Sequence, residues 1–454
     1  MKIVVVGGGP AGVAAAVEAA RTGAGVTLVS ESAIGGRATH ASLVPSKVLL
    51  HAAEARRARR AQGLASPADL AAIHAETESL AKARADRMRL ALADAGARVV
   101  EGVARFVSPK ELEVTAAGGA TRTLPFDAAI VAAGSEPRFP PGFFGEAGKP
   151  DGHFVFAPRH VRAMLELPKT LLVIGGGATG AEHAYAFQAM GVEVTWILDE
   201  LGILPRFDRE LADSLGDVLM ERGIKIVHGK RVLSVVHDPK QGVLAKLDGG
   251  RTYSAERAFV ALGRKADTAR LGLAELGVTL AEDGTIPVDG FGVSALPSIY
   301  VVGDATAGGQ SSARAEATGW TAGRHATRRP VDPVVPSTLV EAVYTSPELA
   351  YVGLSPGGAT RRGVPYDLLT SDFASSLRAT FDGAGRDPHA RGLLRVVTEP
   401  EGGKILGATA IGPHAAEVLA PIAVALRLGA RARDLAHVFL PSPSYGEIAT
   451  AALR

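Results

Sequence analysis

A strand, glycine loop and helix unit occurs twice in this chain, and this repeat is the strongest constraint on its fold. Residues 3–31 (IVVVGGGPAGVAAAVEAARTGAGVTLVSE) align without gaps on residues 171–199 (LLVIGGGATGAEHAYAFQAMGVEVTWILD). Each copy runs from four apolar residues through G-x-G-x-x-G into an Ala-rich stretch typical of a helix, then into a second strand that begins Val-Thr. Each copy ends on an acid, Glu31 or Asp199.

This pattern is typical of a dinucleotide-binding unit. The first glycine makes a tight turn, the second lets the backbone approach a pyrophosphate, and the third lets the helix pack closely on the strand. The helix N-terminus offers free N–H groups to phosphates, and the closing acid can accept hydrogen bonds from ribose hydroxyls. One such motif can be a simple tight turn, but two complete units predict two doubly wound α/β domains. The loop residues are Gly7, Gly9, Pro10, Ala11 and Gly12 in the first copy and Gly175, Gly177 and Gly180 in the second.

Composition narrows the class of protein further. The 454 residues, 47% of them hydrophobic, are enough for about three globular units and exclude a disordered or collagen-like chain. A net charge of +2 gives no case for a nucleic-acid partner. The absence of cysteine excludes disulfides, thiolate metal sites, iron-sulfur clusters and a cysteine nucleophile, and we expect no metal site. The apolar residues 3–17 are too few for a membrane span, so we expect a cytoplasmic protein without a leader or membrane segment.

The rest of the chain alternates helix-like and strand-like segments. Helices are expected over 47–61, 67–95 and 415–428, and strands within 99–131, 128–133, 224–262, 299–304, 392–398 and 404–412. Residues 137–152 and 328–337 are rich in Pro and Gly or charge and read as connections between domains. One basic cluster, Arg56, Arg57, Arg59 and Arg60, is interpreted as a solvated helix face, with a docking or phosphate-binding role as the alternative.

In this order the segments resemble the pyridine nucleotide-disulfide oxidoreductases, the family of lipoamide dehydrogenase, glutathione reductase and mercuric reductase. Besides the glycine loops, the resemblance rests on Gly35-Gly36, Val44-Pro45-Ser46-Lys47, Ala132-Ala133-Gly134-Ser135, Glu182, Ala261-Leu262-Gly263-Arg264, Ile299 to Asp304, and Tyr344-Thr345-Ser346-Pro347-Glu348. The resemblance implies FAD on the first unit, a nicotinamide nucleotide on the second, and a homodimer. It gives an FAD-binding domain over 1–144 and 268–330, an NAD(P)-binding domain over 145–267, and an α+β dimerisation domain over 331–454.

The resemblance also assigns roles to individual residues. Asp304 should hold the flavin ribityl chain, Gly134 and Ser135 should lie against the cofactor, and the backbone from Gly102 to Ala104 should meet adenine. Lys47 and Glu182 should pair beside the reactive flavin nitrogen, since a buried lysine needs a partner; the alternative is two unrelated surface charges. The expected binding set is completed by Glu31, Gly36, Arg37, Ala133, Gly263, Arg264, Gly303 and Ala313, with Asp199 and Glu200 for the nicotinamide nucleotide.

Two departures from the family pattern remove its disulfide chemistry. Ala38 and Leu43 occupy the positions of the two redox cysteines, and a thiol relay requires a thiolate that attacks sulfur. The C-terminal H-P-x-x-x-E motif reads Ser442-Pro443-Ser444-Tyr445-Gly446-Glu447, so the imidazole base is missing while the glutamate remains. We therefore expect no disulfide reductase activity.

The remaining chemistry predicts an FAD-dependent NAD(P)H oxidoreductase with a quinone-like acceptor, similar to the cysteine-less FAD-containing NAD(P)H:quinone reductases. The acceptor would lie in an apolar slot beside Ala38 and Leu43, with Ser442 and Tyr445 of the partner subunit nearby. Tyr445 would be an aromatic wall, a phenolic donor or simple interface packing, and His40 a proton donor or a polar loop residue. The alternatives are a soluble transhydrogenase or diaphorase, and a non-catalytic flavin- or nucleotide-binding redox sensor or subunit.

The acids that close each copy predict the choice of nucleotide. Asp199 and Glu200 would repel a 2′-phosphate, so NADH is preferred over NADPH. Family members place this acid one residue earlier, at Leu198 here, and Arg206 or Arg231 offers a 2′-phosphate partner. The same shift by one residue occurs at Ser30 and Glu31, which leaves either Glu31 or the backbone near Ser30 as the ribose ligand of FAD.

Overall fold

The computed structural model describes residues 1–64, 67–381 and 392–454. These residues form two compact units. The first consists of residues 1–48, 71–138 and 263–335, and the second of 49–70, 139–262 and 336–454. No helix in the described part of the chain is long and apolar enough to cross a membrane.

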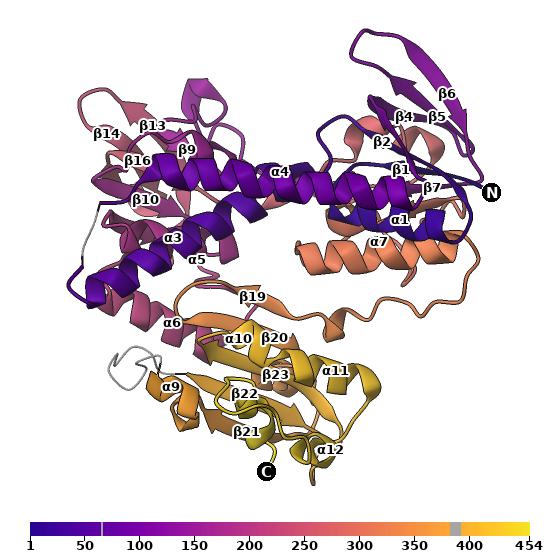
Figure 1. The fold of residues 1–454 in the computed structure, drawn as a ribbon. Helices are drawn as coiled ribbons and strands as arrows, with labels where there is room; N and C mark the ends of the chain where they lie inside the picture. The colour runs from indigo at the N-terminus through magenta and orange to yellow at the C-terminus, as the bar shows by residue number, and fades with distance from the viewer. Residues whose placement is uncertain (65–66, 382–391) are drawn as a thin grey trace. The chain divides into compact units, whose positions relative to one another are not determined.

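A parallel five-stranded sheet is the centre of the first unit, in the order β18-β7-β1-β2-β3. Its strands β1, β2 and β7 are labelled in Figure 1. Its strands are β1 (Lys2–Val6), β2 (Gly25–Ser30), β3 (Arg98–Glu101), β7 (Ala128–Val131) and β18 (Ile299–Val301). The short runs of Val, Ile and Ala in β1 and β7 are buried, as is usual for parallel strands covered on both faces. Because the strands are parallel, their carboxyl ends meet at one edge of the sheet.

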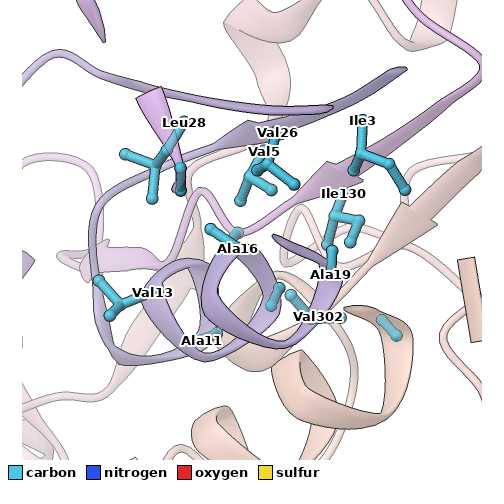
Figure 2. Close-up of a cluster of buried hydrophobic side chains, with 14 of the residues drawn as sticks. Ile3, Val5, Ala11, Val13, Ala16, Ala19, Val26, Leu28, Ile130 and Val302 are labelled. Carbon is cyan, nitrogen blue, oxygen red and sulfur yellow. The ribbon is translucent and has the colours of Figure 1, made fainter. Parts of the chain in front are cut away.

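The helix that follows β1 packs very closely on a second helix. These are α1 (Pro10–Arg21) and α7 (Ser312–Ala326). A Cβ added to Gly319 would lie 2.1 Å from the carbonyl oxygen of Ala11, so only glycine allows this approach. On the sheet side, Val5, Leu28 and Ile130 belong to the same buried cluster as the small residues of α1 (Figure 2). This packing fixes the start of α1 against the sheet.

The remaining elements of the first unit surround this core. The helices are α2 (Gly36–His40), α3 (Leu43–Ala61), which continues into the second unit, and α4 (Leu70–Asp94). An antiparallel meander joins β3 to β7 and consists of β4 (Val103–Ser108), β5 (Glu111–Thr115) and β6 (Thr121–Pro125). A two-stranded ladder pairs β8 (Ser135–Pro137) with β17 (Arg264–Ala266).

A second parallel sheet, in the order β12-β11-β10-β16-β9, repeats this design in the second unit. Its elements are β9 (Val155–Phe156), β10 (Thr170–Ile174), α5 (Ala178–Ala189), β11 (Glu193–Ile197), α6 (Arg209–Glu221), β12 (Lys225–Val227) and β16 (Arg257–Val260). A meander again precedes the last strand, formed by β13 (Val232–Asp238), β14 (Gly242–Leu247) and β15 (Thr252–Ala255). The predicted duplication is therefore confirmed.

The last part of the second unit is an antiparallel sheet in the order β19-β20-β23-β22-β21. Its strands are β19 (Glu341–Val343), β20 (Glu348–Gly353), β21 (Asp367–Asp372), β22 (Leu393–Thr398) and β23 (Ile405–Gly412). The helices are α8 (Pro356–Arg361), α9 (Leu377–Phe381), α10 (Ala415–Val418), α11 (Ala420–Leu428), α12 (Ala432–Ala436) and α13 (Glu447–Ala451). The α/β class with a C-terminal α+β domain is confirmed, while the predicted domain boundaries stay predictions.

Three expected helices differ from the structure. The helix expected over 47–61 begins earlier, at Leu43, as α3. The stretch 415–428 is divided into α10 and α11, because Pro421 has no N–H to continue the ladder of the first helix. The helix expected from residue 67 begins at Leu70 as α4.

Candidate active site

The two glycine turns have the same geometry. A Cβ on the first glycine would lie 2.2 Å from Ala132 O at Gly7 and 2.3 Å from Ala261 O at Gly175. Both of these glycines have positive φ, 110° and 114°. A Cβ on the third glycine would lie 1.8 Å from Gly7 O in the first copy and 2.0 Å from Gly175 O in the second, at Gly12 and Gly180. The fold itself therefore requires these four glycines.

The second glycine of each turn is different. No described atom lies within 4 Å of a Cβ added to Gly9 or Gly177, and both residues have extended backbones that any residue can adopt. Each of them begins a helix that no side chain of the described residues caps. Protein packing thus leaves an open space in front of unbonded helical N–H groups, which is the environment that a pyrophosphate requires. The turns fit a dinucleotide such as FAD.

The other predicted FAD residues lie at the carboxyl ends of neighbouring strands. Gly102 follows β3 and donates its N–H to Ser30 O at the end of β2, at 3.1 Å. Gly303 follows β18, and a Cβ there would lie 3.1 Å from the Cβ of Ala11 in the first turn of α1. The edge that collects these residues is where open α/β sheets bind ligands. Ala104, in β4, is buried, and Ala313 is exposed in the first turn of α7.

A hydrogen-bond network connects three of the predicted residues. Ser135 Oγ donates to Asp304 Oδ2 at 2.5 Å and accepts from Arg264 Nε at 2.7 Å. Arg264 also donates to Ser135 O at 2.8 Å, and burial lowers the pKa of its guanidinium. Ala133 and Gly134 precede Ser135 directly, and Gly263 precedes Arg264. The network holds the Asp304 carboxylate at the sheet edge beside the start of α1.

The structure separates the roles of Ser30 and Glu31. Ser30 is buried, and its hydroxyl donates to Ser32 O at 2.8 Å. Glu31 is exposed and forms an ion pair with Arg270 Nη2 at 2.5 Å, and the hydrogen bond from Arg270 lowers the pKa of Glu31. Sequence analysis missed Arg270, because it lies 239 residues away along the chain.

The loop that carries the cysteines in other family members is held by its backbone. Gly35 N donates to Gly8 O at 2.8 Å, and a Cβ on Gly36 would lie 2.9 Å from Gly9 Cα. Ala38 and Leu43 are half-buried in or beside the short helix α2, and Arg37 and Lys47 are also half-buried. His40 Nε2 donates to Ile34 O at 2.9 Å, so this histidine helps to hold the loop.

The C-terminal motif is occupied by contacts within its own subunit. Tyr445 is 6% exposed and packs against Phe373 in the core of the C-terminal sheet. Glu447, whose family counterpart orients the missing histidine, accepts a hydrogen bond from Ser376 Oγ at 2.8 Å. Ser442 is exposed. Of the three roles proposed for Tyr445, packing agrees best with its burial. The residues that it packs against in this structure belong to its own chain and not to a partner subunit.

In the second unit, Glu182 is 6% exposed and faces inward from α5. Its Oε1 accepts the backbone N–H of Tyr344 at 3.1 Å, a contact that no sequence signal indicates. Lys47 belongs to the first unit and Glu182 to the second, and their pairing stays a prediction.

At the end of β11, Asp199 and Glu200 form a turn. Asp199 Oδ1 accepts the N–H of Leu201 at 3.1 Å, whereas Leu198, at the position of the family acid, is fully buried. Burial raises the pKa of Tyr351, and the nearby charge of Arg206 acts in the opposite direction. Arg231 is exposed.

The basic cluster of α3 is divided by the fold. Arg56 donates to Ala189 O at 3.3 Å, at the end of α5, and Arg57 binds Glu54 at 2.7 Å. Arg59 and Arg60 are exposed. The prediction of one solvated face is therefore wrong for Arg56, which attaches α3 to the end of α5, whereas Arg57 forms an ion pair within α3.

Two glycine turns on two parallel sheets, each with its ligand-binding edge, define an α/β protein with two dinucleotide sites. Residues 1–325 match the model of the pyridine nucleotide-disulphide oxidoreductases, and residues 339–453 match the dimerisation domain of the same proteins. The chain belongs to the pyridine nucleotide-disulphide oxidoreductase family, whose members are flavoproteins that bind FAD and NAD(P)H.

Relatives carry more than one activity in their names. A dihydrolipoyl dehydrogenase of Thermus scotoductus is 33% identical over 98% of this chain and 95% of its own. An NAD(P)H dehydrogenase (quinone) of Mycobacterium tuberculosis is 30% identical over 100% of this chain and 93% of its own. The crystal structure of LpdA from Mycobacterium tuberculosis superposes with a TM-score of 0.92 at 30% identity, covering 100% of this chain and 99% of LpdA.

Proposed function

We propose that this protein is an FAD-dependent NAD(P)H oxidoreductase that passes electrons to a quinone-like acceptor and is not a disulfide reductase. The observation that carries the proposal is the absence of any cysteine, with Ala38 and Leu43 at the positions of the redox pair. Without a thiolate, no residue of the chain can exchange with a disulfide substrate.

FAD, when bound, supplies the acceptor for a hydride of NAD(P)H and the donor of electrons to a second substrate. The chain supplies the binding and orientation. The turns at Gly9 and Gly177 leave room for the two pyrophosphates, and Asp304 offers a carboxylate at the first site. In this proposal Lys47 and Glu182 lie beside the flavin, where Glu182 is oriented by the N–H of Tyr344.

The choice of acceptor rests on the altered loop. Ala38 and Leu43 present apolar surface that neither ionises nor donates a hydrogen bond, which favours a flat apolar molecule that stacks. The relative of Mycobacterium tuberculosis that is named as an NAD(P)H dehydrogenase (quinone) supports the same class.

The proposal also includes the nucleotide and the assembly. We infer a preference for NADH, because Asp199 and Glu200 follow β11 and would place negative charge near a 2′-phosphate. The match of residues 339–453 to a dimerisation domain supports a homodimer, which we expect in the cytoplasm and without a nucleic-acid partner.

An anaerobic acceptor panel tests the proposal. Purified holoprotein is mixed with NADH at fixed concentration, and turnover is compared among menadione, a ubiquinone analogue, NADP⁺ and oxygen, with lipoamide and glutathione disulfide as controls. We expect turnover with quinones and only flavin background with the two disulfides. Fast reduction of NADP⁺ with slow quinones would instead indicate a transhydrogenase, and lipoamide turnover would contradict the proposal.

A stopped-flow experiment separates an enzyme from a binding module. NADH should bleach the flavin absorbance rapidly in the wild type and more slowly in Glu182→Gln, whereas Glu193→Gln, an exposed glutamate in the same unit, should match the wild type. An unchanged flavin spectrum on adding NADH to the wild type would indicate a redox sensor or subunit.

A further inference from the structure

The end of β2 in the first unit lacks the acid that the family pattern places there. Position 30 is a serine, buried to 3% exposure, and its hydroxyl is used by Ser32 O. The charged acceptor next in the chain is Glu31, which lies just after β2 and is exposed, so packing against the sheet does not fix its side chain. A side chain in this position needs an added contact to be held at the sheet edge.

Arg270 provides that contact. Its Nη2 lies 2.5 Å from Glu31 Oε2 and 3.4 Å from Asp267 Oδ2, so one guanidinium connects two carboxylates. The backbone N–H of Asp267 donates to Gly134 O at 3.1 Å. The chain of contacts therefore runs from Glu31 to the turn that the family places against the flavin.

The pair adds little to the stability of the fold. The side chains of Arg270 and Glu31 are 51% and 47% exposed, and exposed ion pairs are worth about 0–1 kcal/mol. A contact that contributes so little to the stability of the fold can still orient the Glu31 carboxylate. Among the described residues the ion pair of Glu31 uses Oε2, and a carboxylate has about four lone-pair sites, so capacity remains for ribose hydroxyls.

We infer that Arg270 is a positioning residue that holds the Glu31 carboxylate at the adenosine end of the FAD site, in compensation for the serine at position 30. A lysine would serve less well, because Arg270 contacts both carboxylates through Nη2 of a planar guanidinium, whereas the ammonium of lysine is a strongly hydrated point charge on a flexible stem. The inference depends on Glu31 as the ribose ligand and is independent of the electron acceptor.

The test is the rate at which FAD leaves the protein, which requires no turnover. Holoprotein is diluted in low-salt buffer, and the rise in fluorescence of released FAD is followed for the wild type, Glu31→Gln, Arg270→Gln and the double variant. We expect release to be faster by roughly 10-fold in Glu31→Gln and about 3- to 10-fold in Arg270→Gln, since a hydrogen bond to a charged group is lost or misplaced. The double variant should be no faster than Glu31→Gln, because Arg270 acts through Glu31.

Two control variants carry the same changes of charge as Arg270→Gln and Glu31→Gln. Arg89→Gln breaks an exposed pair with Asp86 at 3.1 Å, with exposures of 50% and 44%, in the same unit, and should leave release unchanged. Glu101→Gln neutralises the acid opposite Ser30 on β3 and should also match the wild type. Arg270→Lys should recover part of the loss.

The result can overturn the inference in several ways. An unchanged rate of FAD release in Arg270→Gln would show that Arg270 does not position Glu31. Slower release would mean that Arg270 competes with the ribose for Glu31. Additive effects in the double variant would show that the two residues act separately. A larger effect of Glu101→Gln than of Glu31→Gln would move the ribose ligand to β3. If Arg270→Gln unfolds, the comparison of Arg270→Lys with Glu31→Gln decides, since the lysine keeps the charge.

Discussion

Substituting the second or the third glycine of each turn by alanine should separate binding from folding. Gly9 has an extended backbone and open space around its missing Cβ, so Gly9→Ala should change stability by less than about 0.5 kcal/mol. The added methyl group would stand where phosphate oxygens approach to about 3 Å of the loop. We expect FAD affinity to fall at least about 10-fold, which corresponds to roughly 1.4 kcal/mol.

Substitution of the third glycine should instead lower the stability of the fold. In Gly12→Ala the new Cβ would lie 1.8 Å from Gly7 O, so strand and helix must move apart. An approach of 1.8 Å to a backbone oxygen places this overpacking in the upper part of the usual range, about 2–3 kcal/mol, from which a gain of about 1 kcal/mol in helix propensity is subtracted. A net loss of roughly 1–2 kcal/mol lowers the melting temperature by about 2–8 °C.

The repeat supplies an internal replicate of this experiment. Gly177→Ala should raise the KM for NADH with normal flavin content, and Gly180→Ala should lower the melting temperature, because its Cβ would lie 2.0 Å from Gly175 O. The assays are FAD release, NADH kinetics and thermal unfolding by circular dichroism. A Gly9→Ala protein that keeps FAD as well as the wild type, or a Gly12→Ala protein that is equally stable, would refute the reasoning.

Three further outcomes are expected. The hydrogen bond from Arg270 lowers the pKa of Glu31 below its ordinary value of 4.5. The contribution of the ionised Glu31 to FAD binding is therefore complete above about pH 4.5 and is lost as the pH falls through the lowered pKa. FAD release should therefore be flat from about pH 5 to pH 8 and faster in acid, and Glu31→Gln should lack this acid step in the same fluorescence assay. Ser442→His should leave dihydrolipoamide oxidation, followed as NADH formation, at background, because an imidazole without a thiol cannot complete the relay; measurable turnover would be the contrary result. Asp199→Asn should raise kcat/KM for NADPH relative to NADH by about 3- to 10-fold, because the amide oxygen can still accept from Leu201 while the repulsion is removed; an unchanged ratio would show that Asp199 does not discriminate.

The duplicated unit could be predicted because its signals are local. The glycine spacing, the apolar strands and the Ala-rich helices all fall within about 30 residues, and both copies form as expected in β1-α1-β2 and β10-α5-β11. The residues after β7 and β18 could be placed as well, because parallel strands bring their carboxyl ends to one edge.

Contacts between distant segments could not be predicted. Arg270 and Glu31, or Ser376 and Glu447, are polar residues of ordinary composition, and their side chains meet only through the tertiary fold. The burial of Tyr445 in its own subunit was hidden for the same reason, because a single aromatic residue in a turn-rich segment gives no periodicity.

Main-chain hydrogen bonds hold much of the loop in which Ala38 and Leu43 stand at the cysteine positions of the family pattern. Gly35 is bonded to Gly8, Ala41 and Ser42 are bonded to Arg37 O, and Ser46 N is bonded to Ser42 O. None of these bonds uses the side chain at position 38 or 43. Changing the side chains at these two positions would therefore leave the main-chain hydrogen bonds of the loop in place, so the same backbone frame can present side chains of different chemistry.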